Sequence, residues 1–135
     1  MSSTLSAATV LSAAVCLLAG CGGDPAPDNA ALVDALSGGR TAEVTVQGPV
    51  VALLVDEPAR SDGPHQRFDV RVADVVVEVD YNLDLAPRVP VKVGDNVVIH
   101  GEFVPDPGHP IIHDVHHATG SHEGGWLELD GRRYE

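Results

Sequence analysis

The sequence has little of three things: thiols, basic side chains and long apolar runs. Of its 135 residues only two are cysteines, Cys16 and Cys21, both near the N-terminus. If processing removes Cys16 and modifies Cys21, the folded part keeps no free thiol, which excludes disulfides and a Cys-His catalytic pair there. The sequence also has no Gly-x-Ser-x-Gly turn and no glycine-rich phosphate loop, so the common nucleophile and nucleotide motifs are absent.

Basic residues number 8 against 20 acidic ones, giving a net charge of −12, and the longest basic run is Arg132-Arg133. A nucleic acid or an anionic headgroup requires a basic stripe that compensates its charge. The sequence therefore predicts no nucleic-acid partner.

The first twenty residues carry no charged side chain. Their apolar stretch, Leu5 to Ala19, is shorter than the roughly 20 residues that a membrane-spanning helix needs, and it is typical of a signal peptide. It ends in Leu18-Ala19-Gly20-Cys21, which resembles the bacterial lipobox. We therefore expect a signal peptide over residues 1–20, lipidation of Cys21, and export to the cell envelope with the membrane as a partner through the lipid. Gly22 resembles the sorting context for the outer membrane if the cell is Gram-negative.

Residues 21–41 are predicted to form the acylated cysteine, a polar tether and a short helix. The tether, Gly22 to Asp28, is too polar to bury apolar area. The helix, Ala30 to Leu36, has Asp28 or Asn29 as its N-cap and ends at Gly38-Gly39.

From residue 42 onward the apolar pattern changes to period two, which is typical of half-buried strands. Gly48-Pro49 interrupts the first strand, and Asp130-Gly131 is a strong hairpin signal near the end. The expected buried faces are Val44 and Val46, continued after the interruption by Val51, Leu53 and Val55; Phe68, Val70 and Val72; Val75, Val77, Val79 and Tyr81; and Val97, Ile99, Gly101 and Phe103, with a fifth strand over Ile111 to His117 and a hairpin over Trp126 to Tyr134.

Closure would remove the exposed edges of these Val-rich strands. We therefore predict an all-β fold, a small five-stranded OB-like barrel over residues 42–135, with a short N-terminal helix and a C-terminal hairpin. An open meander and an SH3-like barrel fit the same periodicity.

Several segments together resemble a bacterial family of uncharacterised exported proteins, the family of domain of unknown function 3465, over about His65 to Tyr134. They are Pro64-His65-Gln66-Arg67-Phe68, Asn82-Leu83-Asp84-Leu85-Ala86-Pro87-Arg88, Gly94-Asp95, Gly101-Glu102-Phe103, His113-Asp114-Val115-His116-His117, and His122 with Gly125-Trp126-Leu127. The family hallmark is His-Trp-Thr-His-His, so Asp114 and Val115 depart from it. Tyr81 departs too, because a histidine is expected there. The resemblance implies export and this fold, and it implies no activity.

Five of the seven histidines lie between residues 109 and 122. Imidazoles that converge form sites for zinc and other transition metals. The candidate ligands are His113, His116, His117 and His122, with His65.

The spacing leaves their geometry open. On a helix, His113, His116 and His117 share a face. On a strand, His113 and His117 lie roughly 13 Å apart and His116 points to the other side. A strand that ends near His116 and folds back at residues 118–120 would bring His116 or His117 to His122. The alternative is that these rings only bond backbone and carboxylate groups over the barrel mouth.

Other polar residues have weaker signals. Asp84 and Arg88 are candidates for a buried structural pair or a ligand contact in the proline-interrupted segment, and Arg67 is equally ambiguous. His100 is expected to point outward into solvent, and His109 to lie in a loop.

The leading hypothesis is a non-enzymatic envelope lipoprotein that binds zinc or another divalent transition metal. The first alternative is a metal-free module that binds a peptide, a glycan or a small ligand and has no cofactor. The second is a metal-dependent hydrolase with Glu123 or Asp114 as the base. The sequence identifies no protein or small-molecule partner.

Overall fold

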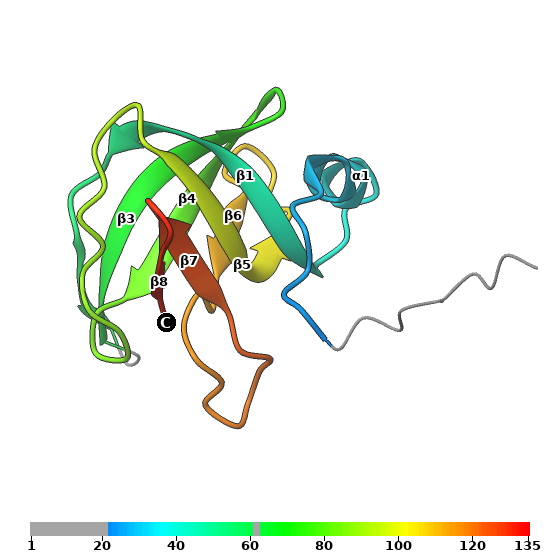
Figure 1. Ribbon diagram of the computed structural model, residues 1–135. Helices are drawn as coiled ribbons and strands as arrows, with labels where there is room; N and C mark the ends of the chain where they lie inside the picture. The colour runs from blue at the N-terminus through cyan, green and yellow to red at the C-terminus, as the bar shows by residue number, and fades with distance from the viewer. Residues whose placement is uncertain (1–21, 61–62) are drawn as a thin grey trace, which may run out of the picture.

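The computed structural model describes residues 22–60 and 63–135, and its regular structure is almost entirely β (Figure 1). The predicted signal peptide and Cys21 lie outside these residues. The elements are α1 (Asn29–Ser37), β1 (Ala42–Leu53), β2 (Glu57–Arg60), β3 (Gly63–Val72), β4 (Val75–Asn82), β5 (Asn96–Val104), β6 (Ile111–His113), β7 (Trp126–Leu129) and β8 (Arg132–Tyr134).

Five of the strands close into a barrel. β1 pairs with β3, and β3 pairs with β4, both antiparallel. β4 pairs with β6 in parallel. β6 pairs with β5 and β5 with β1, both antiparallel, which closes the ring. A five-stranded closed ring with this non-sequential order is OB-like. The predicted fold class is therefore confirmed, in preference to the open meander and the SH3-like barrel. β2 pairs with β3 outside the ring, and β7 and β8 extend the sheet from β5.

The barrel interior follows the predicted alternation on three strands. The side chains that point inward from β3, β4 and β5 have at most a few per cent of their surface exposed, because a strand presents every second residue to the same face. These core residues are Phe68, Val70, Val72, Val77, Val79, Tyr81, Val97, Ile99 and Phe103.

The expected face of β1 is wrong after Gly48-Pro49. The pairing of β1 with β3 shifts between Val50 and Ala52, which marks a bulge. Val50 lies before this bulge, continues the face of Val44 and Val46 across Gly48-Pro49, and is 1% exposed. Leu53 pairs with the inward-facing Phe68 after the bulge, but it is the last residue of the strand and is 54% exposed, and Val55, beyond the strand, is 86% exposed.

Helix α1 packs against β1 through Leu32 and Ala35, both buried. Its N-cap is Asp28, whose side chain accepts a hydrogen bond from the backbone N–H of Ala31. The side chain of Asn29 bonds both backbone groups of Gln47, which fixes the start of the helix on the barrel. The predicted helix is thus confirmed. No helix in the described ranges is long and apolar enough to cross a membrane.

The irregular connection between β4 and β5 is held by two side chains from elsewhere. The amide of Gln66 bonds the backbone N–H and C=O of Val89, at 2.9 and 2.7 Å. The guanidinium of Arg88 forks onto the carboxylate of Asp56. The prediction of a buried pair between Asp84 and Arg88 is wrong, because Arg88 pairs with Asp56 and the side chains of these two residues are 53% and 40% exposed. Asp84 is not the partner of Arg88; its backbone N–H is bonded by Asn82 Oδ1 at 2.9 Å.

The C-terminal hairpin is confirmed. Asp130 and Gly131, between β7 and β8, have φ angles of 52° and 76°. Positive φ at both central positions is what a two-residue turn between twisted strands requires. The hairpin therefore places Trp126, at the start of β7, beside His100 of β5.

Candidate metal site

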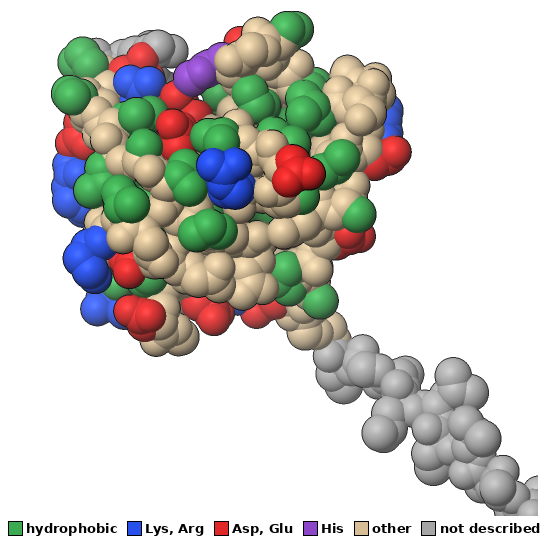
Figure 2. All heavy atoms as spheres, turned by 90° about the horizontal axis from the view of Figure 1, so that it is seen from above, with side chains coloured by type: hydrophobic (Ala, Val, Ile, Leu, Met, Phe, Trp, Pro, Cys, Tyr) green, Lys and Arg blue, Asp and Glu red, His purple; other side chains and the backbone are tan. Residues whose placement is uncertain are grey.

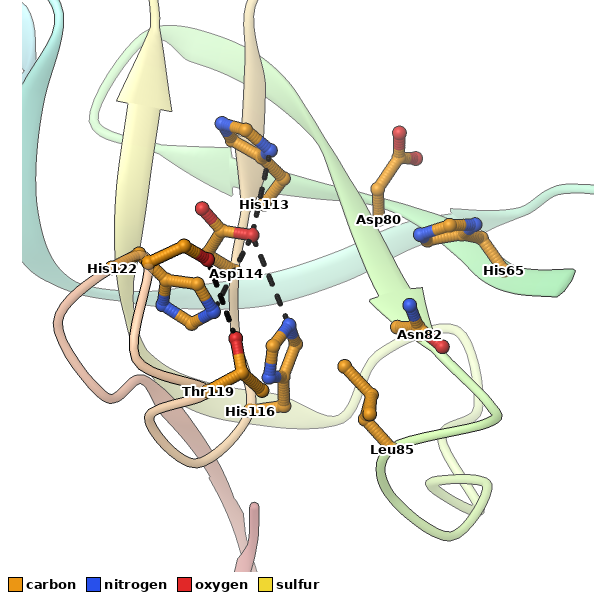
Figure 3. A pocket seen from close by; sticks show the side chains of 10 residues that line it. His65, Asp80, Asn82, Leu85, His113, Asp114, His116, Thr119 and His122 are labelled. Atoms are coloured by element: carbon orange, nitrogen blue, oxygen red, sulfur yellow. Dashed lines mark hydrogen bonds and ion pairs between the residues drawn. The ribbon is translucent and has the colours of Figure 1, made fainter. Parts of the chain in front are cut away.

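The candidate site lies where β6 ends, at the end of the barrel from which loop 114–125 projects (Figures 1 and 3). Figure 2 views the molecule from above, and on that face histidine is confined to one spot among interspersed apolar and charged side chains. His113, His116 and His122 lie in and beside loop 114–125 (Figure 3).

The predicted strand Ile111 to His117 ends early, at His113. The cause is Asp114, whose φ of 56° is left-handed and turns the chain out of the strand. Aspartate tolerates this conformation better than most residues. The loop then folds back, and the N–H of Gly125 donates to the carbonyl of His116 at 2.7 Å. As a result His122 lies against His116, with ring centroids 4.7 Å apart.

Two glycines let the turn at Asp114 pack directly on β5. A Cβ on Gly101 would lie 2.7 Å from the carbonyl oxygen of His113. A Cβ on Gly125 would lie 2.2 Å from the carbonyl oxygen of Asp114 and 2.6 Å from that of His100. Any other residue at these positions would have to displace backbone, so the position of Asp114 depends on both.

The side chains of Asp114, His116 and His122 converge (Figure 3). Asp114 Oδ1 lies 3.8 Å from His116 Nε2 and 3.9 Å from His122 Nε2. Ligand atoms about 2.0–2.1 Å from a tetrahedral zinc lie roughly 3.3 Å from one another. The two distances to Asp114 exceed that spacing by roughly half an ångström, and all three donor atoms lie within 4.8 Å of one another.

The hydrogen bonds of both rings leave Nε2 available. His116 Nδ1 bonds the carbonyl oxygen of His117 at 2.9 Å, and His122 Nδ1 bonds that of Glu123 at 2.5 Å. A carbonyl only accepts, so Nδ1 carries the proton and the lone pair of a neutral ring is on Nε2. A bond from the second nitrogen to a backbone carbonyl is the usual support of a metal-binding histidine.

Electrostatics favour neutral imidazole and an added cation. Burial lowers the pKa of His116, so its Nε2 stays unprotonated at neutral pH. The pKa of Glu43 is raised, first by burial and then by the nearby carboxylates of Glu123, Glu102 and Asp114. Negative charge is therefore concentrated around the site.

His113 lies on the other side of Asp114 and belongs to a second group. Its Nε2 is 3.1 Å from Glu102 Oε2, and its Nδ1 is 3.8 Å from Asp114 Oδ1. Glu102, His113 and Asp114 together offer three ligand atoms within 4.8 Å of one another. Asp114 thus contributes to both groups.

A cavity of about 190 Å³ opens beside the converging side chains. His65 and Asp80, from β3 and β4, stand on its opposite wall in Figure 3 with Asn82 and Leu85. His65 thus faces the site from across the cavity and is outside both donor groups. Burial, together with the neighbouring Glu78, raises the pKa of Asp80 to about 7. A small ligand in this cavity would contact both the donor cluster and Asp80.

The remaining histidines lie elsewhere. His117 is exposed and belongs to neither donor group; its ring stands edge-on to His116, 6.0 Å away. His100, expected to be in solvent, is only 8% exposed. Its Nδ1 bonds Thr45 Oγ1 at 2.8 Å, and its ring stacks on Trp126. The solvent prediction for His100 is wrong because Trp126, its partner on the neighbouring strand β7, stacks on its ring.

Arg67 lies on the outer face of β3 and β4. Its Nε bonds Glu78 Oε1 at 2.5 Å, and Glu78 is 4% exposed. His109, in a loop as predicted, brings its Nε2 to 2.7 Å from the other oxygen of Glu78. Burial opposes the ionisation of Glu78, but the bonds from Arg67 and Asp80 outweigh it and lower the pKa. These contacts border a separate cavity of about 400 Å³.

Sequence reasoning missed two potential ligands, Asp114 and Glu102. Asp114 was considered only as a base, although its place between two histidines, in a residue type that tolerates positive φ, is a signal for a ligand at a turn. Glu102 was not among the candidate ligands. Its closeness to His113 depends on the pairing of β5 with β6, which no local pattern shows.

The fold and the site together define an OB-like barrel with a histidine and carboxylate cluster at one end. The chain belongs to the family described as protein of unknown function DUF3465, whose model matches residues 18–135. This confirms the resemblance seen in the sequence. A comparison with curated proteins gave no match.

Proposed function

We propose that this protein is a non-enzymatic lipoprotein of the cell envelope that binds a divalent transition-metal ion through Asp114, His116 and His122. One observation carries the proposal: two imidazoles, each committed through Nδ1 to a backbone carbonyl, direct Nε2 at the same carboxylate oxygen. A metal-binding cluster needs unprotonated donor atoms that converge in this way. Without an ion, neither Nε2 atom has a proton to donate to the carboxylate oxygen that it faces.

The donor set suits borderline metals. Two imidazoles and one carboxylate match zinc, and they also accept cobalt, nickel and copper. Structural zinc sites are closed by four protein ligands, whereas three leave a position open. Here the open position would face the cavity of about 190 Å³, so the ion would remain exchangeable and reachable by a small ligand.

The envelope location rests on the N-terminal sequence. Leu18-Ala19-Gly20-Cys21 follows an uncharged apolar stretch, and the polar residues after it separate the cysteine from the barrel. An ion site on an exported, lipid-tethered barrel would act in the periplasm or at the outer membrane if the cell is Gram-negative. It would sample metal outside the cytoplasm.

The test is metal binding by the full chain, purified in detergent and stripped with a chelator. We expect zinc, nickel or copper to raise the unfolding temperature, because a ligand that binds only the folded state at 100 times its Kd adds about 2.7 kcal/mol. The double variant His116→Ala/His122→Ala should lose this response. His117→Ala is the matched control, since it removes an adjacent exposed imidazole and keeps the carbonyl that His116 bonds.

Two results would contradict the proposal. An unchanged unfolding temperature with all three metals would leave no metal site to explain. An equal loss in His117→Ala and in the double variant would mean that the response comes from exposed imidazoles in general. A screen for hydrolysis of phosphoester and peptide substrates by the metal-loaded protein separates binding from catalysis, and we expect no turnover above the metal-free control.

The second candidate function is a metal-free binding module. The observation that favours it is the cavity of about 400 Å³ on the outer face of β3 and β4, bordered by Arg67, Asp69, Glu78 and His109. OB-type barrels commonly bind oligosaccharides and other oligomeric ligands on this face, between the first and the last connecting loops of the barrel. A thermal response to glycan or peptide mixtures, with none to metals, would support it over the metal site.

A further inference from the structure

The second donor group, Glu102, His113 and Asp114, has the spacing of a cation site. The His113 Nε2 to Glu102 Oε2 distance is 3.1 Å, and the histidine atom is buried with no hydrogen-bond partner among the described residues. Ligand atoms at neighbouring positions of an octahedral ion lie roughly 3.0 Å apart when each bond is about 2.1 Å long. The pair therefore already stands at a ligand-to-ligand distance.

The surrounding charge is not balanced by protein cations. Glu43 and Glu102 are directly opposite each other in the β1–β5 pairing. Like charges in that position destabilise a sheet. Glu123 and Asp114 add two more carboxylates near them. In the part of the chain that the structure describes, the ion pairs of these four carboxylates all involve histidine, and none involves Lys or Arg.

Asp114 connects the two donor groups. Its Oδ1 lies 3.8 Å from His113 Nδ1 as well as 3.8 Å and 3.9 Å from the Nε2 atoms of His116 and His122. A carboxylate can bridge two ions, as in two-metal sites whose ions are about 3.5–4 Å apart. The left-handed φ of Asp114, held by the close packing on Gly125, places this carboxylate between His113 on one side and His116 and His122 on the other (Figure 3).

We propose that the protein binds two divalent transition-metal ions, with the Asp114 carboxylate shared between them. One ion is held by Asp114, His116 and His122, and the other by Glu102, His113 and Asp114. The inference rests on the proposed function, because it takes the first ion as given. It goes further in assigning a second site, a second metal equivalent and a bridging role to Asp114. Two divalent ions would balance the four carboxylates.

The test is the number of ions bound by the full chain in detergent, measured by calorimetric titration with zinc and by elemental analysis after desalting. We expect two equivalents for the wild type. Glu102→Gln and His113→Gln should each retain one. Glu43→Gln is the matched control, since it removes the same charge from the facing position on β1, belongs to neither donor group, and should keep two.

The outcomes separate the two proposals. One equivalent in the wild type overturns the second site and leaves the first. None overturns both. A drop in Glu43→Gln equal to that in Glu102→Gln overturns ligation by Glu102, because local charge alone would then account for the loss.

Copper supplies a second readout that does not depend on the variants. Two Cu²⁺ ions on one bridging carboxylate should lose the signal of isolated copper in electron paramagnetic resonance as the second equivalent is added, because their spins couple at this separation. Two additive signals of isolated copper would place the ions far apart and overturn the shared Asp114.

Discussion

Gly125 is the residue on which the geometry of the site most depends, and Gly125→Ala is the most informative single substitution. The new Cβ would lie 2.2 Å from the carbonyl oxygen of Asp114, 2.6 Å from that of His100 and 2.9 Å from the Cα of Val115. All three are backbone atoms, so a rotamer change cannot relieve the contact. The backbone would have to separate by about an ångström, since contacts of this kind normally lie at about 3.5–4.0 Å.

The cost can be bounded. Overpacking in a filled interior costs about 1–3 kcal/mol, and a clash with backbone on two elements belongs at the upper end. For a domain of about 100 residues, each kcal/mol lowers the unfolding temperature by about 4–8 °C. We therefore expect metal-free Gly125→Ala to unfold roughly 10–20 °C below the wild type. It should also lose the zinc response, because the strain acts on the backbone of Asp114.

Gly124→Ala is the control for this experiment. Its Cβ would lie 3.1 Å from the backbone nitrogen of Ala118, a contact that a shift of a few tenths of an ångström relieves. We expect a small change in unfolding temperature and a retained zinc response. If Gly125→Ala unfolded at the wild-type temperature and responded to zinc like the wild type, the argument that the glycine positions Asp114 would be refuted.

Three further predictions follow from the charges and from the N-terminal sequence. The pKa of Asp80 is raised to about 7, so the folded protein binds more protons than the unfolded chain between about pH 4 and 7. The free energy of unfolding should therefore fall, on the order of 2 kcal/mol, as the pH rises from 5 to 8. In urea titrations, Asp80→Asn should remove most of that fall. Glu102→Gln should stabilise the metal-free protein by about 0.5 kcal/mol through relief of the repulsion from Glu43, and a lowered unfolding temperature without metal would contradict this. Cys21→Ser should abolish incorporation of labelled palmitate and release the protein from the membrane fraction, whereas an unchanged membrane fraction would rule out the lipid anchor.

The barrel was predictable from the sequence because apolar residues recur at every second position along much of β3, β4 and β5. The hairpin was predictable from Asp130-Gly131, and the helix from Asp28 and the apolar residues after it. In each case the signal is local: period, cap or turn chemistry determines the element. Phe68, Val77 and Ile99 are therefore buried as the pattern indicates.

The misses have non-local causes. The inward face of β1 continues to Val50 across Gly48-Pro49, and the bulge that follows appears only when β1 and β3 are paired. His100 is buried because Trp126 packs on it from a strand that lies later in the chain. The length of β6 is set by one positive φ at Asp114, which the packing on Gly125 holds in place.

The candidate site was only half predictable. His116 and His122 were named from composition and a possible reversal of the chain, and the structure brings them together. Glu102 was missed as a ligand because its closeness to His113 depends on which strands pair at the end of the barrel. Asp114 had a local signal, its place between histidines, but it was considered only as a base. His117 could not be separated from its neighbours by spacing alone.

The most direct test of the metal site is an anomalous diffraction map of the cobalt-loaded protein, collected above and below the cobalt absorption edge. We predict a peak within bonding distance of Asp114 Oδ1, His116 Nε2 and His122 Nε2. Ordered rings around this position without an anomalous peak, at a cobalt concentration that saturates the thermal response, would contradict the account.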